Sequence, residues 1–114
     1  MKIYGIPNCN TVKKALDWLK ANQIDYDFHD FKKHGISGSK LKEWSEELGW
    51  EALINKRGTT WKKLDPQIQA SVIDEQTAFA LMQEKPSMIK RPVIESPQGL
   101  LLGFDEDKYK QVLG

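Results

Sequence analysis

The chain contains one cysteine, Cys9, and its position in the sequence is the first feature that could support chemistry. Cys9 follows the short apolar run "KIYGI", which gives way to a turn near Pro7, and it precedes a segment with helical spacing. We therefore expect Cys9 between a strand and a helix, where unpaired N–H groups and the helix dipole create positive potential. A thiol placed there is stabilised as the thiolate, so its pKa should fall below the ~8.5 of a free cysteine. The alternative is an inert cysteine in the core.

The expected first turn after Cys9 carries cations where helices usually carry acids. Residues 10–14 contain no Asp or Glu, but they include Lys13 and Lys14. Cations at this end oppose the helix dipole at a cost of roughly 0.3–1 kcal/mol each, which a bound anion or the thiolate itself would offset. Three nearby polar residues could hydrogen-bond the sulfur or an anion, although turn and capping roles suit them equally well. They are Asn8, Asn10 and Thr11.

The elements that must position these residues begin with a β-α-β unit. Residues 2–6 are predicted as a buried strand, and apolar side chains then recur at helical spacing from Val12 to Leu19, with the helix ending near Asn22. Apolar and polar residues alternate over residues 24–31, which predicts a half-buried strand. A unit of this kind joins two parallel strands.

A helical insertion is predicted over about residues 36–86. Capping signals bound two helices in it, one between Ser37 or Ser39 and Gly49, and one between Asp74 and Pro86. A short helix and a loop around Gly58 are expected between these two helices.

The C-terminal part of the chain predicts two further strands and a last helix. Residues 91–96 and 99–104 flank the turn "SPQG", which favours a hairpin, and residues 105–114 are predicted as a short helix. Without the insertion, the order β-α-β followed by β-β-α is a thioredoxin-like arrangement. We therefore predict an α/β fold with a mixed sheet, in a single domain of residues 1–114.

Only two of the 17 basic residues are arginines, Arg57 and Arg91, and both fall between expected elements. Arginine offers a planar fork that matches oxyanions and carboxylates, which lysine cannot copy. For Arg57 alone we favour a surface ion pair. Arg91 precedes Pro92 at the start of an expected strand, and in a thioredoxin-like layout that strand start faces the helix terminus that carries Cys9. We therefore predict a cis bond between Arg91 and Pro92 that places Arg91 beside Cys9.

Three segments, in the order "IPNCNTVKKALDWL", "LINKRGTTWKKL" and "PSMIKRPVIES", carry a resemblance to a known family. Together they resemble the arsenate reductase (ArsC)/Spx family over essentially the whole chain. The likeness is greatest to its short YffB-like branch, for which a glutathione-dependent thiol reductase activity has been proposed. The resemblance implies a thioredoxin-like fold with a helical insertion. In the arsenate reductases of this family, an N-terminal cysteine attacks arsenate, glutathione displaces the product, and a glutaredoxin reduces the mixed disulfide.

Matched position by position, the resemblance assigns roles to several residues. It makes Cys9 the nucleophile, Arg91 the arginine of the family's "RP" motif, and Pro92 its cis-proline. The arsenate reductases carry a second arginine nearer the position of Asn55, where this chain offers Arg57 as a displaced oxyanion ligand.

The chain also departs from the family at two other positions. A third arginine is expected in the final hairpin, where Phe104 lies near its place. Val12 stands three residues after Cys9, so the C-x-x-C redox pair of many Spx-type regulators is absent. The first departure argues against efficient arsenate reduction, and the second argues against a disulfide switch.

A monothiol mechanism follows from these residues. The Cys9 thiolate would attack a disulfide substrate or a small oxyanion, and an external thiol must resolve the mixed disulfide because the chain has no second cysteine. Glutathione is the expected co-substrate, and Arg91, Lys13 and the N–H groups of residues 10–12 could hold its carboxylates. A glutaredoxin is a further candidate partner.

Three functions remain open at this point. We favour a glutathione-dependent thiol oxidoreductase. The first alternative is an arsenate reductase that depends on glutathione and glutaredoxin. The second is a non-enzymatic regulator that binds RNA polymerase, as Spx-type regulators do.

Composition and charge limit the other classes of protein. A net charge of +1 argues against a nucleic-acid binder, and no apolar run approaches the ~20 residues that span a bilayer. The N-terminal segment lacks the apolar core of a signal peptide, so we expect a cytoplasmic protein, where a free thiol survives. We expect no metal cluster and no bound cofactor, and we interpret His29 and His34 as structural or solvated.

Overall fold

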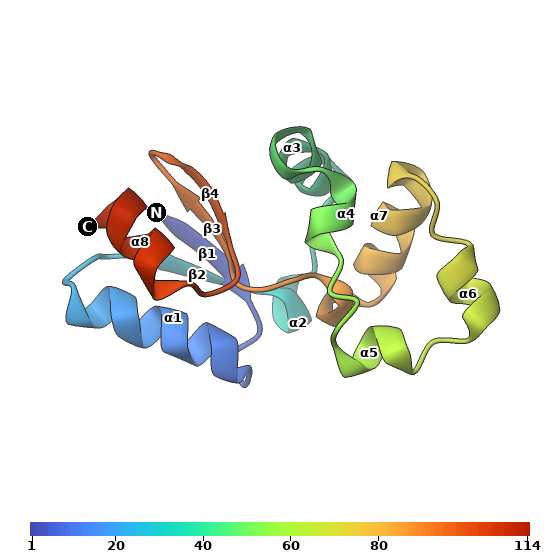
Figure 1. Ribbon diagram of the computed structural model, residues 1–114, viewed down its shortest axis with the longest axis horizontal. Coiled ribbons are helices and arrows are strands. Elements are labelled where there is room, and N and C mark those ends of the chain that lie inside the picture. The colour runs from blue at the N-terminus through green and yellow to red at the C-terminus, as the bar shows by residue number, and fades with distance from the viewer. The chain divides into compact units, whose positions relative to one another are not determined.

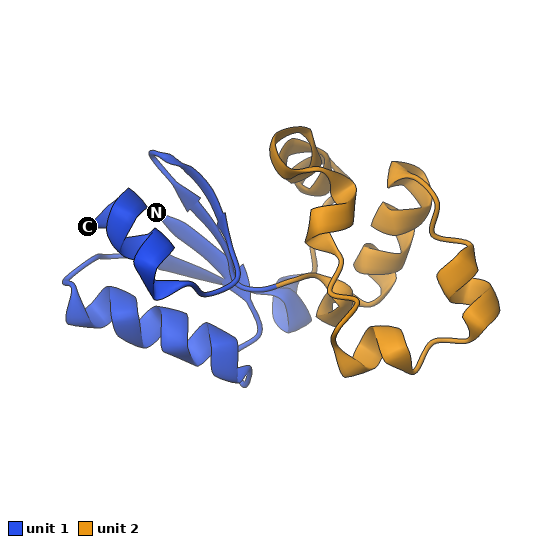
Figure 2. Cartoon of the chain, in the orientation of Figure 1, with its two compact units in different colours: residues 1–34, 91–114 blue, residues 35–90 orange.

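The computed structural model describes residues 1–114, which form two compact units (Figure 2). Unit 1 joins the two ends of the chain, Met1–His34 and Arg91–Gly114, and unit 2 is the continuous segment Gly35–Lys90. No helix in either unit combines the length and the apolar character that crossing a bilayer requires.

Unit 1 is built around a four-stranded sheet (Figure 1). Its elements are β1 (Lys2–Gly5), α1 (Asn10–Ala21), β2 (Asp27–Asp30), α2 (Phe31–His34), β3 (Val93–Ser96), β4 (Gly99–Leu102) and α8 (Glu106–Leu113). The strand order is β2-β1-β3-β4, with β1 parallel to β2, and with β3 antiparallel to both β1 and β4. This mixed sheet, formed by a β-α-β and then a β-β-α segment, confirms the predicted α/β, thioredoxin-like fold.

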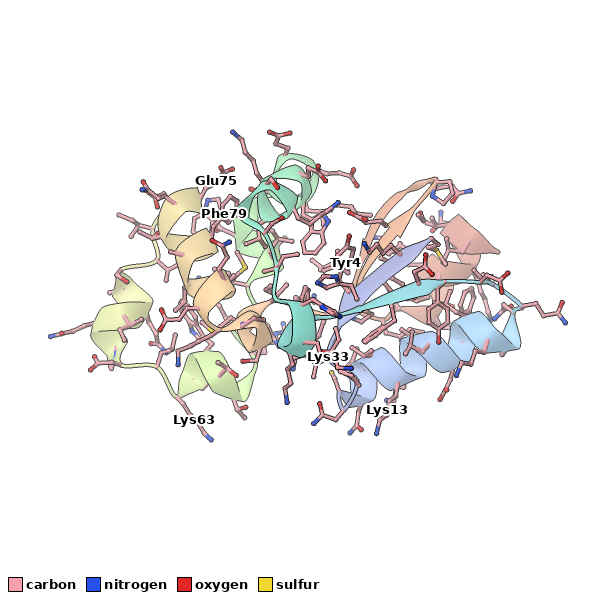
Figure 3. The ribbon with its side chains drawn as sticks, turned by 180° about the vertical axis from the view of Figure 1, so that it is seen from behind. Tyr4, Lys13, Lys33, Lys63, Glu75 and Phe79 are labelled. Atoms are coloured by element: carbon pink, nitrogen blue, oxygen red, sulfur yellow. The ribbon has the colours of Figure 1, made fainter.

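The two faces of the sheet carry different side chains because successive residues of a strand point to opposite faces. Ile3 of β1 pairs with Ile94 of β3, and both belong to the core on the face that α1 and α8 cover (Figure 1). Tyr4 lies on the opposite face (Figure 3), where its ring centroid is 4.9 Å from that of His29. The buried side chains of the α1/α8 core are Ile3, Ala15, Trp18, Leu19, Ile94, Leu101 and Tyr109.

An aromatic stack joins α8 to α1 within this core. The ring of Tyr109 meets the ring of Trp18 edge-on, with centroids 5.5 Å apart, and it meets Phe104 in the same manner at 5.1 Å. The Tyr109 hydroxyl donates a hydrogen bond to the Gly103 carbonyl. Burial, followed by the negative charge of Asp105, raises the pKa of Tyr109, so this donor keeps its proton.

The second strand is shorter than the predicted span of residues 24–31. It covers only Asp27–Asp30, since β1 offers just four residues as parallel partners. Ile24 still packs against the core, although it precedes the paired segment. The strand ends where the Asp30 carboxylate accepts a hydrogen bond from the Lys32 N–H at 2.8 Å, because this turn opens α2.

Unit 2 is almost entirely helical. Its elements are α3 (Gly38–Leu48), α4 (Trp50–Leu53), α5 (Thr59–Lys62), α6 (Pro66–Ala70), α7 (Glu75–Glu84) and the 3₁₀-helix η1 (Pro86–Met88). An isolated bridge between Ile54 and Ile89 ties the residue after α4 to the residue after η1. Its buried apolar side chains are Leu41, Trp44, Leu53, Ile54, Ala78, Leu81, Met82, Met88 and Ile89.

The predicted caps of the two longer helices in unit 2 are confirmed. The Ser37 hydroxyl caps α3 by accepting a hydrogen bond from the Lys40 N–H at 3.2 Å, and Gly49 ends the helix with a φ of 86°. Asp74 caps α7 in a capping box with Thr77. These local signals set the helix boundaries because each satisfies backbone groups that the helix itself leaves unpaired.

Candidate active site at Cys9

Cys9 is the N-cap residue of α1 and has an extended backbone, with φ −98° and ψ 127°. The Cys9 N–H donates to the Ile6 carbonyl at 3.3 Å, which closes the preceding turn, and the Cys9 carbonyl accepts from the Lys13 N–H at 3.0 Å, which begins the helix. The cysteine therefore lies at the strand-to-helix junction that the sequence predicts. Its side chain is partly exposed, so the sulfur is accessible to a reagent.

The pKa of the Cys9 thiol lies below its ordinary value. Burial is the largest single influence and raises the pKa, but the Val12 N–H, the charge and hydrogen bonding of Arg91, and the Thr11 N–H together lower it by more. The two N–H groups belong to the first turn of α1, where backbone donors have no acceptor inside the helix. Neither N–H group makes a capping hydrogen bond with the Cys9 side chain, so we interpret both as donors that face the sulfur and stabilise it as the thiolate.

Arg91 lies beside Cys9 because of the way in which β3 joins the sheet. Val93, the first residue of β3, pairs with Tyr4 in antiparallel register. The residues before Val93 therefore run alongside those after Tyr4, which lead to Cys9. The peptide bond between Arg91 and Pro92 is cis, and Pro92 is buried. The guanidinium of Arg91 acts on the sulfur both as a charge and as a hydrogen-bond donor.

The other polar candidates around Cys9 have exposed side chains. They are Asn8, Asn10, Thr11 and Lys13. Figure 3 shows Lys13 near the N-terminal end of α1. The groups that lower the pKa of Cys9 include the Thr11 N–H but not Lys13.

Arg57 belongs to unit 2 and lies between α4 and α5. The Arg57 side chain is exposed. The backbone N–H of Arg57 donates a hydrogen bond to the side-chain oxygen of Asn55 at 3.2 Å. A Cβ at Gly58 would lie 2.9 Å from the side-chain nitrogen of Asn55. Asn55 therefore organises this loop from within, which is a structural use of the position near which the arsenate reductases carry an arginine.

Phe104 lies near the place where the resemblance puts a third arginine. Its ring packs against Tyr109 and is half-buried at the α1/α8 core. This chain uses the position for packing, and an arginine there would have to bury its charge or leave the aromatic stack.

The two histidines lie in or beside an aromatic cluster on the sheet face away from α1. The ring centroid of His29 is 4.9 Å from that of Tyr4, 6.0 Å from that of Phe31 and 5.6 Å from that of His34. These contacts support the structural interpretation of His29. No group of three or more His, Cys, Asp or Glu side chains is arranged to hold a metal ion.

Two further residues, Val12 and Gly5, also shape the site. The sequence indicates the Val12 N–H only as one of three that could hold a carboxylate, yet this N–H is the largest single influence that lowers the pKa of Cys9. Its place three residues after the N-cap could have identified it, because that N–H is the usual donor to a capping side chain. Gly5 lies close to Val12, and no pattern in the sequence indicates this contact.

Comparison with known proteins decides the family. The family description "ArsC family" matches residues 4–112. The chain belongs to the ArsC family. The resemblance seen in its three sequence segments is thereby confirmed.

Solved structures and curated relatives place the chain within this family. The structure of a protein named YffB is 44% identical, with a TM-score of 0.92, and the match covers 99% of this chain and 98% of that chain. An arsenate reductase (ArsC) related protein from Brucella melitensis is 43% identical, with a TM-score of 0.76, over 96% of this chain and 91% of that chain. The global transcriptional regulator Spx of Lactiplantibacillus plantarum is 27% identical over 97% of this chain and 84% of its own length.

Membership of this ArsC family limits the chemistry that the site performs. It supports a thiol oxidoreductase or arsenate reductase-like function, and hence an enzyme of the reductase type. The likeness to YffB supports the predicted YffB-like branch. Relatives named as Spx are transcriptional regulators.

Proposed function

We propose that the protein is a glutathione-dependent thiol oxidoreductase in which Cys9 is the only nucleophile. The observation that carries the proposal is a partly exposed thiol, at the start of α1, whose pKa is lowered by Arg91 and two backbone N–H groups. A thiolate attacks disulfides, whereas a thiol does not, so a lowered pKa increases the reactive fraction at neutral pH.

The proposed cycle has two exchange steps. The Cys9 thiolate attacks the glutathione sulfur of a mixed disulfide, R–S–S–G. The new Cys9–glutathione disulfide forms as the S–S bond of R–S–S–G breaks, and the leaving thiolate RS⁻ takes up a proton. A second glutathione thiolate then attacks the glutathione sulfur on Cys9, which releases oxidised glutathione and restores the Cys9 thiolate. The net reaction converts R–S–S–G and one glutathione into RSH and oxidised glutathione.

The choice of an external thiol rests on the cysteine count. Cys9 is the only cysteine in the chain, so no internal thiol can resolve the mixed disulfide. Glutathione carries carboxylates, and Arg91 together with Lys13 offers cations at the thiol end of unit 1 to receive them. A glutaredoxin could take the place of the second glutathione in the last step.

Mass spectrometry and turnover together test this proposal. Purified protein is incubated with a glutathione mixed disulfide of a small thiol, and oxidised glutathione is then measured in the presence of reduced glutathione, with and without glutaredoxin. The wild type should gain the mass of one glutathione and turn over the substrate. Cys9→Ser should do neither while keeping its fold, because serine is a good N-cap residue. Equal turnover by Cys9→Ser would refute the proposal.

Arsenate reduction is the second candidate, because the chain resembles an arsenate reductase-related protein from Brucella melitensis. Against it, Asn55 organises its own loop and Phe104 belongs to the core, so two arginine positions of the arsenate reductases are used for other purposes. The same assay with arsenate in place of the mixed disulfide separates the two. If arsenite forms faster than the mixed disulfide is exchanged, arsenate reductase replaces the proposed function.

A further inference from the structure

Gly5, the last residue of β1, lies against the first turn of α1 with no room for a side chain. A Cβ built at Gly5 would lie 2.9 Å from Val12 Cγ2, 3.5 Å from Val12 Cγ1 and 3.7 Å from Phe28 Cε1. Real Cβ atoms essentially never approach a neighbour within 3.0 Å. Even the methyl group of alanine at this position would therefore force a movement.

The backbone conformation of Gly5 does not explain why the residue is a glycine. The glycines with positive φ are Gly35, Gly49, Gly99 and Gly103, and Gly5 is not among them. Gly5 instead continues the regular pairing of β1 with Asp30 of β2, in a strand position where glycine is disfavoured. A glycine inside a strand often marks the close approach of another part of the chain, and here that part is α1.

Val12 cannot easily move its methyl groups out of the way. Its side chain is fully buried, with 0% exposed, and a β-branched residue in a helix has one strongly preferred χ1 rotamer. A side chain at Gly5 would therefore displace the backbone of the first turn rather than rotate Val12. This backbone carries the Val12 N–H, which acts on the Cys9 sulfur.

We propose that Gly5 is a positioning residue of the thiol site. Its missing side chain lets the first turn of α1 lie against the end of β1, and this contact holds the Val12 and Thr11 N–H groups toward the Cys9 sulfur. Gly5 acts through Val12 and does not itself touch the substrate. The role rests on the proposed function of Cys9 as a thiolate nucleophile.

The test is the pH dependence of Cys9 alkylation in Gly5→Ala, with the modified fraction measured by mass spectrometry. The midpoint should rise by roughly half a pH unit or more, which lowers the rate about threefold at a pH well below the midpoint. A merely structural role would lower the melting temperature and leave the midpoint unchanged. Because the readout needs no enzymatic activity, it is independent of the glutathione assay.

Two controls separate the contact with Val12 from a general effect of replacing glycine by alanine. Gly38→Ala adds the same methyl group in α3, where its nearest neighbour is a Gln83 side-chain atom 3.7 Å away, and it should leave the midpoint unchanged. Val12→Ala keeps the N–H and removes the methyl groups that Gly5→Ala would meet. In the Val12→Ala background, Gly5→Ala should therefore no longer shift the midpoint.

The outcomes distinguish this inference from the proposed function. If Gly5→Ala does not fold, Val12→Ile takes its place in the test. It adds a carbon at Cγ1, 3.5 Å from the Cβ position of Gly5, so it crowds the same contact and should also raise the midpoint of Cys9 alkylation. An unchanged midpoint in the folded variant, or an equal rise in Gly38→Ala, overturns the role of Gly5. A wild-type midpoint at or above that of free cysteine overturns the thiolate function itself.

Discussion

Arg91 offers Cys9 a full positive charge and a hydrogen-bond donor, whereas the start of α1 offers only partial charges. Both kinds of group lower the pKa of the thiol, whereas burial raises it and is the largest single influence. The net lowering is thus a difference between opposing effects. Such a difference is sensitive to the loss of any one stabilising group.

The first prediction concerns the charge and the fork of Arg91. Arg91→Gln should raise the alkylation midpoint of Cys9 by about one pH unit, which is a tenfold loss of thiolate at a pH well below the midpoint. Arg91→Lys keeps the charge but loses the planar fork, so its midpoint should fall between those of the wild type and Arg91→Gln. Arg57→Gln, which removes an exposed arginine of unit 2, is the matched control. The assigned role of Arg91 is wrong if the midpoint of Cys9 alkylation in Arg91→Gln equals that of the wild type.

The lowered pKa of Cys9 also predicts how stability depends on pH. A thiol whose pKa is lower in the folded state stabilises the fold above the pKa of the unfolded chain, and this contribution is lost as the pH falls through the folded-state pKa. The free energy of unfolding of the wild type, relative to that of Cys9→Ser, should therefore increase with pH. Denaturant titrations between pH 5 and about pH 9.5, above the ~8.5 of a free thiol, would measure it. A difference that is constant across this range would contradict a stabilised thiolate.

A further prediction concerns Arg57, which the resemblance offers as a displaced oxyanion ligand. If its planar fork binds an oxyanion, Arg57→Lys should weaken the binding of a small oxyanion several-fold in calorimetry and change the melting temperature little, because the side chain is exposed. Lys20→Ala removes an exposed lysine in the last turn of α1 and serves as the comparison. If only general charge matters, Lys20→Ala should weaken the binding, whereas Arg57→Lys, which keeps the charge, should not.

Among the elements, α8 has one buried side chain, that of Tyr109, which makes two kinds of contact with the rest of unit 1. Tyr109 stacks between Trp18 and Phe104, and its hydroxyl donates to the Gly103 carbonyl. Tyr109→Phe keeps the rings and leaves the carbonyl of Gly103 without this donor. We expect it to lower the free energy of unfolding by about 1–2 kcal/mol, measured in denaturant. Tyr26→Phe, at a half-buried tyrosine, should lower the free energy of unfolding by less. An equal loss in both variants would indicate that the hydrogen bond of the Tyr109 hydroxyl contributes nothing.

The elements that the sequence predicts well are those with two agreeing signals. α1 has both apolar periodicity and a terminus near Asn22, and α3 and α7 have both a polar N-cap and a stop signal. The helices α2, α5 and α6 were not predicted because four or five residues are too few to show helical periodicity. α6 did carry a start signal, since Pro66 follows the N-cap Asp65.

The residues of the candidate site also differ in whether the sequence indicates them. Cys9 and Arg91 could be selected from the sequence because the order of strands brings the start of β3 alongside the end of β1. The contribution of Gly5 could not, because it depends on how closely a helix approaches a strand. Distances of a few tenths of an ångström follow from packing in three dimensions, and composition and spacing carry no information about them.

In the whole molecule, the thiol site lies in unit 1 and the helical insertion forms unit 2. The core of unit 1 draws on both ends of the chain, from Ile3 to Tyr109, whereas unit 2 is one continuous segment with buried side chains of its own. Cys9 and Arg91 both belong to unit 1, and Arg57 belongs to unit 2. The properties of the thiol should therefore depend on the core of unit 1.

The last prediction compares two core truncations of similar size, one in each unit. Ile94 of β3 and Met82 of α7 are both fully buried, with 0% exposed, so Ile94→Ala and Met82→Ala should each cost about 2–5 kcal/mol. Hydrogen exchange should accelerate in β1, β2 and β3 for Ile94→Ala, and in α3 and α7 for Met82→Ala. The midpoint of Cys9 alkylation should rise only in Ile94→Ala, because only that core supports the strand end and the start of α1. Equal acceleration throughout the chain in both variants would show that the two units unfold together as the single domain predicted from the sequence.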